Sequence, residues 1–131
     1  MRGVKAWDTN FLVRHLLEDD ARQLAVVRRE LDKAVRTGGR VWLAQLVLVE
    51  TVWVLGAHLD KHGVLDTLEE VLADDRFLVQ DAEQVRAALD HARAKGDFAE
   101  HLIAQNARAA GCVKTQTFDR AVKRFGAFEM L

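Results

Sequence analysis

Short β-prone runs and longer amphipathic stretches alternate along this chain. The short runs are rich in β-branched and aromatic residues and are bounded by Gly, Asp or Asn, which is typical of strands. They predict strands at residues 4–8, 41–43, 77–79, 113–117 and 128–130, the last of these at the edge of the sheet.

The stretches between them repeat apolar residues with helical spacing, as Leu24, Val27, Leu31 and Val35 do. Asn10 is expected to cap the first of these helices. Strands that alternate with helices predict an α/β fold with a parallel sheet. Helices are expected at about residues 10–20, 24–35, 44–59, 64–73, 85–92 and 97–110, with a helical turn at 120–124.

The composition fits one globular domain over residues 1–131, because half of the residues are hydrophobic. The longest apolar run, Leu46 to Leu55, is interrupted by Glu50 and Thr51 and is too short to cross a bilayer. No signal peptide is recognisable, and the single Cys112 fits a reducing compartment. We therefore expect a soluble cytoplasmic protein that is not bound to a membrane.

Four acidic residues stand at the ends of predicted elements. Asp8 ends the first strand, Glu50 interrupts an apolar helix, Asp97 opens a helix, and Asp119 follows the fourth strand. A parallel sheet gathers the carboxyl ends of its strands into one crevice. Carboxylates packed together repel unless a cation neutralises them, and hard oxygen ligands suit Mg²⁺ or Mn²⁺. The pattern therefore indicates a metal site for phosphoryl transfer or phosphodiester hydrolysis.

Three of these acids also have simpler local interpretations. Asp8 would turn the chain after a strand, and Asp119 would cap the following turn. Asp97 and Glu100 have the spacing of a capping box, although Ser or Thr is usual at its first position.

Glu50 is different, because apolar residues surround it and its helix is expected to be buried. A buried carboxylate needs a compensating partner or else becomes protonated, which favours a functional role for Glu50. His101 lies on the same helix face as Asp97 and is either a packing or surface residue, or a general acid or phosphate contact.

The formal charge of −1 does not by itself indicate nucleic-acid binding. An acidic pocket would repel RNA, so a nuclease would need a basic rim as well as a metal. Candidates for this rim flank the acids: Arg14, Lys114, Arg120, Lys123 and Arg124.

At these residues the chain resembles the PIN-domain ribonucleases, and most closely the VapC-type toxins of bacterial toxin–antitoxin pairs. The resemblance runs from Asp8 to Leu131 and is carried by four blocks in a fixed order. These are Asp-Thr-Asn-Phe-Leu-Val-Arg from Asp8, Leu-Val-Glu-Thr-Val-Trp-Val-Leu from Leu48, Gly-Asp-Phe-Ala-Glu-His-Leu-Ile-Ala from Gly96, and Thr-Phe-Asp-Arg from Thr117.

The resemblance implies a three-layer fold with a central, about five-stranded parallel sheet flanked by helices. It also implies that Asp8, Glu50, Asp97 and Asp119 bind Mg²⁺ or Mn²⁺, with Asn10 and Thr117 in support. Glu100 stands where many members have Asp, and the resemblance implies a supporting role for it as well. The resemblance further implies an endoribonuclease that hydrolyses RNA with a metal-activated water, a cognate antitoxin protein, and a homodimer.

Several alternatives are left open by the residues. A receiver domain would need an acidic neighbour for Asp8, and a haloacid-dehalogenase-type phosphatase would need Asp where the chain has Asn10. A solitary RNA-processing nuclease and a non-catalytic PIN binding module also remain, and DNA is open as a substrate. If an antitoxin helix docks, apolar residues that are equally well explained as core would hold it: Leu12, Leu16, Leu24, Val27, Leu65 and Leu68.

Overall fold

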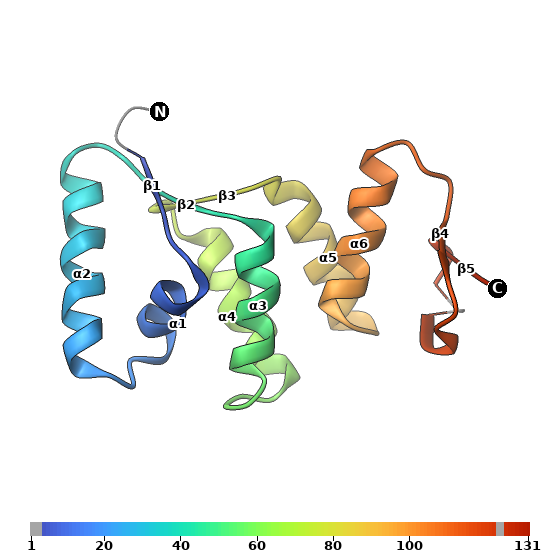
Figure 1. Ribbon diagram of the computed structural model, residues 1–131, viewed down its shortest axis with the longest axis horizontal. Coiled ribbons are helices and arrows are strands. Elements are labelled where there is room, and N and C mark those ends of the chain that lie inside the picture. Colours follow the sequence, from blue (N-terminus) through green and yellow to red (C-terminus); the bar gives the residue numbers. More distant parts are fainter. Residues whose placement is uncertain (1–3, 123–124) are drawn as a thin grey trace. The chain divides into compact units, whose positions relative to one another are not determined.

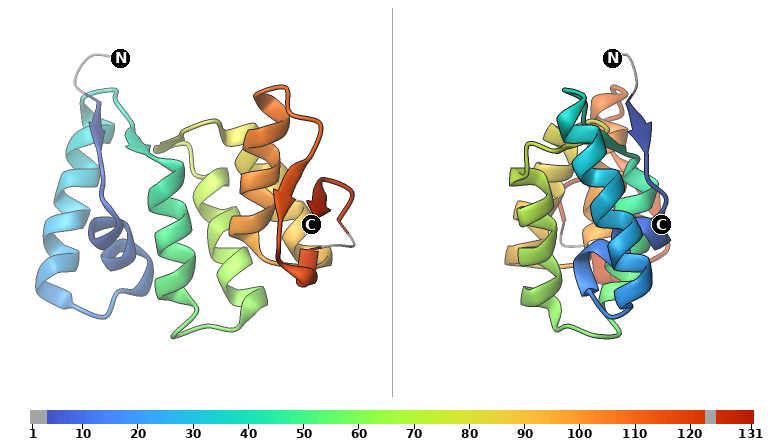
Figure 2. Two further views of the ribbon diagram at one scale, coloured as in Figure 1. Left: turned by 45° about the vertical axis from the view of Figure 1, so that its right-hand side comes forward. Right: turned by 90° about the vertical axis from the view of Figure 1, so that its left-hand side faces the viewer.

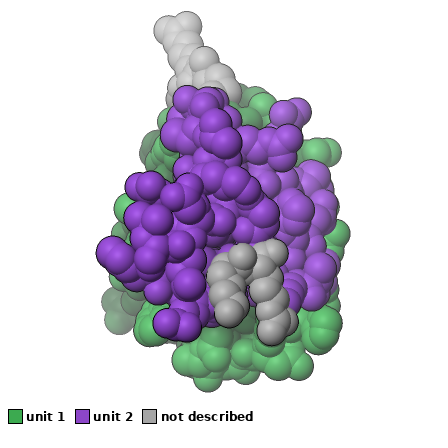
Figure 3. Space-filling view, turned by 90° about the vertical axis from the view of Figure 1, so that its right-hand side faces the viewer, with its two compact units in different colours: residues 1–82 green, residues 83–131 purple. Residues whose placement is uncertain are grey.

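The computed structural model describes residues 4–122 and 125–131, which form two compact units. Unit 1 comprises residues 1–82 and unit 2 comprises residues 83–131, and Figure 3 distinguishes them by colour.

The described part of unit 1 contains three strands and four complete helices. The strands β1 (Lys5–Ala6), β2 (Val41–Leu43) and β3 (Phe77–Val79) form a parallel sheet in the order β1-β2-β3. The helices α1 (Thr9–Leu17), α2 (Ala21–Arg36), α3 (Gln45–Leu55) and α4 (Lys61–Ala73) complete the unit (Figure 1). In the register of the sheet, Lys5 pairs with Val41, and Val41 with Phe77.

The connections of unit 1 place two helix starts beside each other. β1 leads into α1 and the neighbouring parallel strand β2 leads into α3, so both helices begin at the carboxyl edge of the sheet. The helices α1 and α3 pack on each other, around a core that includes the fully buried Leu12, Leu48 and Leu55. Burying apolar side chains of this size stabilises the fold by about 1.5–3 kcal/mol each.

Unit 2 contains most of α5 (Ala82–Ala94), α6 (Phe98–Ala109), a 3-10 turn (Arg120–Val122) and the strands β4 (Thr115–Thr117) and β5 (Phe128–Met130). The two strands pair in parallel, with Thr115 opposite Phe128 (Figure 2). Ala104 of α6 packs with Val122 and Phe128, so a small apolar core joins α6 to the β4–β5 pair.

The α/β class with parallel strands is confirmed, whereas one continuous five-stranded sheet is not found. The five described strands form a three-stranded sheet and a separate two-stranded sheet. The difference arises because β4 pairs with β5 and not with a strand of the first sheet. Each strand has only two or three residues, so each pair of strands is joined by few hydrogen bonds. No described helix is long and apolar enough to cross a membrane.

Candidate functional site

Asp8 of unit 1 lies at the junction between β1 and α1. It occupies the N-cap of α1 with an extended backbone, and its Oδ1 accepts a 2.9 Å hydrogen bond from the Phe11 amide. The expected cap, Asn10, lies inside the helix, so that prediction is wrong. Capping uses one carboxylate oxygen of Asp8, and the other is left for a ligand.

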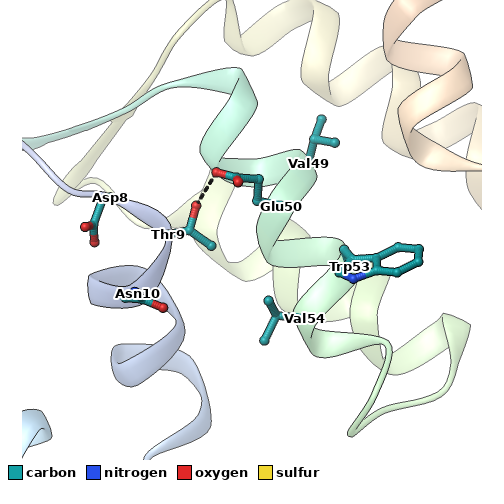
Figure 4. Close-up of a pocket in the computed structure, with 7 residues that line it drawn as sticks. All are labelled: Asp8, Thr9, Asn10, Val49, Glu50, Trp53 and Val54. Atoms are coloured by element: carbon teal, nitrogen blue, oxygen red, sulfur yellow. Dashed lines mark hydrogen bonds between the residues drawn. The ribbon is translucent and has the colours of Figure 1, made fainter.

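A hydroxyl group links the start of α1 to α3. The Thr9 Oγ1 donates a 2.8 Å hydrogen bond to Glu50 Oε1, and Figure 4 shows Thr9 between Asp8 and Glu50. Thr9 is a site residue that was not predicted from the sequence. The feature that could have indicated it is a hydroxyl at the first helical position, directly after Asp8.

Asp8 and Glu50 line the same cavity. Its volume is about 610 Å³, and it lies between the first residues of α1 and one face of α3 (Figure 4). Unit 1 therefore brings two of the four predicted acids together, with Asn10 beside them. The full lining is Asp8, Thr9, Asn10, Val49, Glu50, Trp53 and Val54.

The predicted burial of Glu50 is wrong, because its side chain is exposed. Helix α3 buries only one face, through Leu48, Thr51 and Leu55, and leaves Trp53 85% exposed. An apolar sequence all round a helix does not determine which face finds a partner. The exposed carboxylate needs no buried cation, so burial does not support a functional role for Glu50. Its place in the cavity beside Asp8 supports that role instead.

In unit 2, Asp97 stands at the N-cap of α6 but makes no capping hydrogen bond through its side chain. The capping-box interpretation therefore does not hold for this carboxylate, and neither of its oxygens is used in capping. Gly96 before it has φ +85°, and a Cβ there would lie 2.5 Å from Cζ of Phe125. Only glycine fits this turn into Asp97 without strain.

Three further residues of unit 2 interact near the end of β4. The pKa of Glu100 is raised above its ordinary value, mainly by burial. Hydrogen bonding with Asp119 and the charges of Asp119 and Asp97 raise it further. The Asp119 amide donates to Thr117 Oγ1 at 2.9 Å, and Asp119 Oδ1 accepts from the Ala121 amide at 2.8 Å. Within unit 2, the charges of both predicted acids, Asp97 and Asp119, therefore act on Glu100.

His101 has a structural role. It is 8% exposed, its Nε2 donates to the Lys95 carbonyl oxygen at 2.7 Å, and its ring lies 4.7 Å from that of Phe125 between centroids. A histidine held in this way packs the turn before α6, which supports the packing interpretation of His101.

The predicted basic rim is partly engaged in internal contacts. Arg14 Nη1 pairs with Asp19 Oδ1 at 2.7 Å, and this hydrogen bond is the main reason that the pKa of Asp19 is lowered. The Lys114 ammonium donates to the Gly126 carbonyl oxygen, whereas Arg120 is exposed. Lys123 and Arg124 lie outside the described residues.

The donor types fit a hard divalent cation. Carboxylate and hydroxyl oxygens are the ligands that Mg²⁺ and Mn²⁺ prefer. After burial and hydrogen bonding with Asp119, the charges of Asp119 and Asp97 also raise the pKa of Glu100, and a cation would relieve this repulsion. Within residues 4–122 and 125–131, however, no three His, Cys, Asp or Glu side chains are arranged to hold a metal ion, so the fit rests on donor chemistry.

Comparison with protein families gives a match over nearly the whole chain. The model of the PIN domain family matches residues 6–127, a range that includes Asp8, Glu50, Asp97 and Asp119. The chain belongs to the PIN domain family, whose members are generally nucleases that use divalent metals. A comparison with curated proteins found no match.

Proposed function

We infer that the chain is a metal-dependent endoribonuclease in which Asp8, Glu50, Asp97 and Asp119 bind Mg²⁺ or Mn²⁺. The observation that carries this proposal is the cavity of unit 1, which the Asp8 and Glu50 carboxylates both line. The chain also belongs to the PIN domain family. Bound Mg²⁺ or Mn²⁺ would supply an activated water and neutralise charge at phosphorus.

The residues around the acids orient them. The Phe11 amide holds one oxygen of Asp8, and the Thr9 hydroxyl holds one oxygen of Glu50. Thr117 fixes the turn that carries Asp119, and Asp119 contributes to the raised pKa of Glu100. Ligands held by such contacts lose less side-chain freedom on binding a cation.

Cleavage of a labelled single-stranded oligoribonucleotide tests the proposal. Wild-type protein should cleave it with Mg²⁺ or Mn²⁺, stop with EDTA, and resume when the metal is restored, while Asp97→Asn stays inactive. A wild type that binds RNA without cleaving it in either metal would indicate the alternative, a non-catalytic PIN binding module.

We further propose that this nuclease is the toxin of a toxin–antitoxin pair, works as a homodimer, and is silenced by a cognate antitoxin in the cytoplasm. This proposal is supported by the four VapC-like sequence blocks. A bidentate arginine of the antitoxin would suit the Asp8 carboxylate. Five of the six apolar residues considered as its docking surface are core, since Leu12, Leu24, Val27, Leu65 and Leu68 are each at most 8% exposed, whereas Leu16 is half-buried.

Growth of bacteria that express the chain separates this proposal from a solitary RNA-processing nuclease. Wild type alone should slow growth, Asp8→Asn should be harmless, and co-expression of the protein encoded by the neighbouring gene should restore growth. Active enzyme in vitro with no effect on growth would support the solitary nuclease.

A further inference from the structure

A second cavity of unit 1 lies apart from the acids and has no part in the function proposed so far. Its volume is about 510 Å³, and it lies between strand β1, helix α1 and helix α2. Apolar groups of Trp7, Phe11, Val26 and Ala34 line it. The Trp7 and Phe11 rings lie 5.0 Å apart between centroids, so aromatic surface forms part of the wall.

A third cavity shares lining residues with both this cavity and the acidic one. The third cavity, of about 340 Å³, shares Asp8 and Asn10 with the acidic cavity, and Phe11 and Val26 with the β1–α2 cavity. The three cavities therefore adjoin one another along unit 1, from Glu50 past Asp8 to helix α2, and together they are called the trough.

Basic side chains follow the trough away from the acids. Arg14, held by Asp19, lines its middle part. The exposed Lys5 and Lys33 line its far end. A run of cations beside an aromatic wall matches the phosphates and bases of a single strand, whereas an apolar peptide would gain little from these charges.

Besides the two lysines, the far end offers hydrogen-bond acceptors. Glu30 is an acceptor when ionised. The Thr37 hydroxyl donates to the carbonyl oxygens of Lys33 and Ala34, so its lone pairs are what it offers to a ligand. Acceptors favour a base with an exocyclic amino group, which adenine, cytosine and guanine have and uracil lacks.

We propose that the β1–α2 cavity binds an unpaired nucleotide of the RNA substrate, with its base against Phe11 and its phosphate near Lys33, and that it prefers an amino-bearing base to uracil. This inference rests on the proposed function, because it takes the strand that enters the acidic cavity to be RNA. The volume is within the range of pockets that hold ligands of nucleotide size.

Fluorescence anisotropy with labelled single-stranded oligoribonucleotides tests the proposal. An Asp97→Asn background prevents cleavage, and Phe11→Leu removes the aromatic face but keeps an apolar side chain. We expect Phe11→Leu and Lys33→Ala each to weaken binding about tenfold. Arg29→Ala removes a cation from the same helix outside the trough and should bind like the parent. Thermal melts show whether each variant is folded.

An oligoribonucleotide series locates the base. One abasic position should weaken binding by the parent about tenfold and have little further effect in Phe11→Leu, and uracil at that position should bind more weakly than adenine or cytosine. Equal losses for Lys33→Ala and Arg29→Ala would overturn the subsite, as would unchanged RNA binding in folded Phe11→Leu. Reduced affinity for a partner protein alone would reassign the cavity to that partner.

The two proposals fail in distinguishable ways. If the wild type cleaves RNA in the presence of metal but the trough variants bind as the parent does, only the nucleotide subsite is wrong. If the wild type neither binds nor cleaves RNA, the nuclease proposal fails and the subsite fails with it.

Discussion

The Thr9 hydroxyl and the Glu50 carboxylate are joined by a hydrogen bond of 2.8 Å although they lie 41 positions apart in the sequence. The bond connects the first residue of α1 to the middle of α3. It holds one Glu50 oxygen at the cavity that Asp8 also lines. The orientation of a proposed metal ligand thus depends on a residue that binds no metal itself.

Replacing Thr9 by valine should therefore slow cleavage more than it destabilises the fold. Loss of a group that orients a metal ligand costs about 10- to 100-fold in activity. The free energy of unfolding should fall by about 1 kcal/mol or less, because the bond is exposed. Single-turnover cleavage and urea denaturation measure the two effects. Thr9→Ser keeps the hydroxyl and should stay near the wild-type rate, and equal losses in both variants would contradict this role.

Two substitutions of Asp8 should separate its cap from its charge. Asparagine caps helices as well as aspartate does, so Asp8→Asn should keep the hydrogen bond to Phe11. Asp8→Ala should lose about 1 kcal/mol of stability. Both should lose cleavage activity, because neither retains the carboxylate. An active Asp8→Asn enzyme would show that the residue serves only as a cap.

The raised pKa of Glu100 predicts a pH-dependent stability without metal. A carboxyl whose pKa is higher in the folded state stabilises the fold at low pH, and this contribution is lost as the pH rises past its ordinary value of 4.5 and through the folded-state pKa. Glu100→Gln cannot lose a proton. In EDTA, its melting temperature relative to wild type should therefore increase from pH 4 to pH 7. A difference independent of pH would contradict the crowding of Glu100 with Asp119 and Asp97.

Gly96→Ala should destabilise the turn that carries Asp97. The backbone has φ +85°, and an added Cβ would lie 2.5 Å from the Phe125 ring and 3.0 Å from His101 Nε2. Strain of this kind costs on the order of 1–3 kcal/mol, which thermal unfolding would detect. Gly111→Ala provides the matched control, because it also has positive φ but meets no neighbouring atoms. Equal effects of the two substitutions would show that the ring contact contributes nothing.

Much of the secondary structure could be predicted because its signals are local. Strands β2 and β3 have the predicted bounds, since short β-prone runs with turn residues at their ends define them. The separation of the β4–β5 pair from the other described strands could not be predicted, because local sequence does not determine which strands share a sheet.

The site was predictable to a smaller extent. The acids at element junctions were recognisable as residue types, yet the exposure of Glu50 depends on which face of α3 packs. The Asp97–Glu100 spacing resembles a capping box, but Asp97 makes no capping bond and Glu100 interacts with Asp119. The bond from Thr9 to Glu50 requires the tertiary fold, so local sequence does not reveal it.

Thermal unfolding as a function of Mn²⁺ concentration tests the central claim that these acids bind a divalent metal. A ligand that binds only the native state adds about 2.7 kcal/mol of stability at 100 times its dissociation constant. Wild type should therefore melt at higher temperatures as Mn²⁺ is added. Asp8→Asn, Glu50→Gln, Asp97→Asn and Asp119→Asn should each require more Mn²⁺ for the same increase. A wild-type melting temperature unchanged by millimolar Mn²⁺, or four variants that respond as wild type does, would contradict the account.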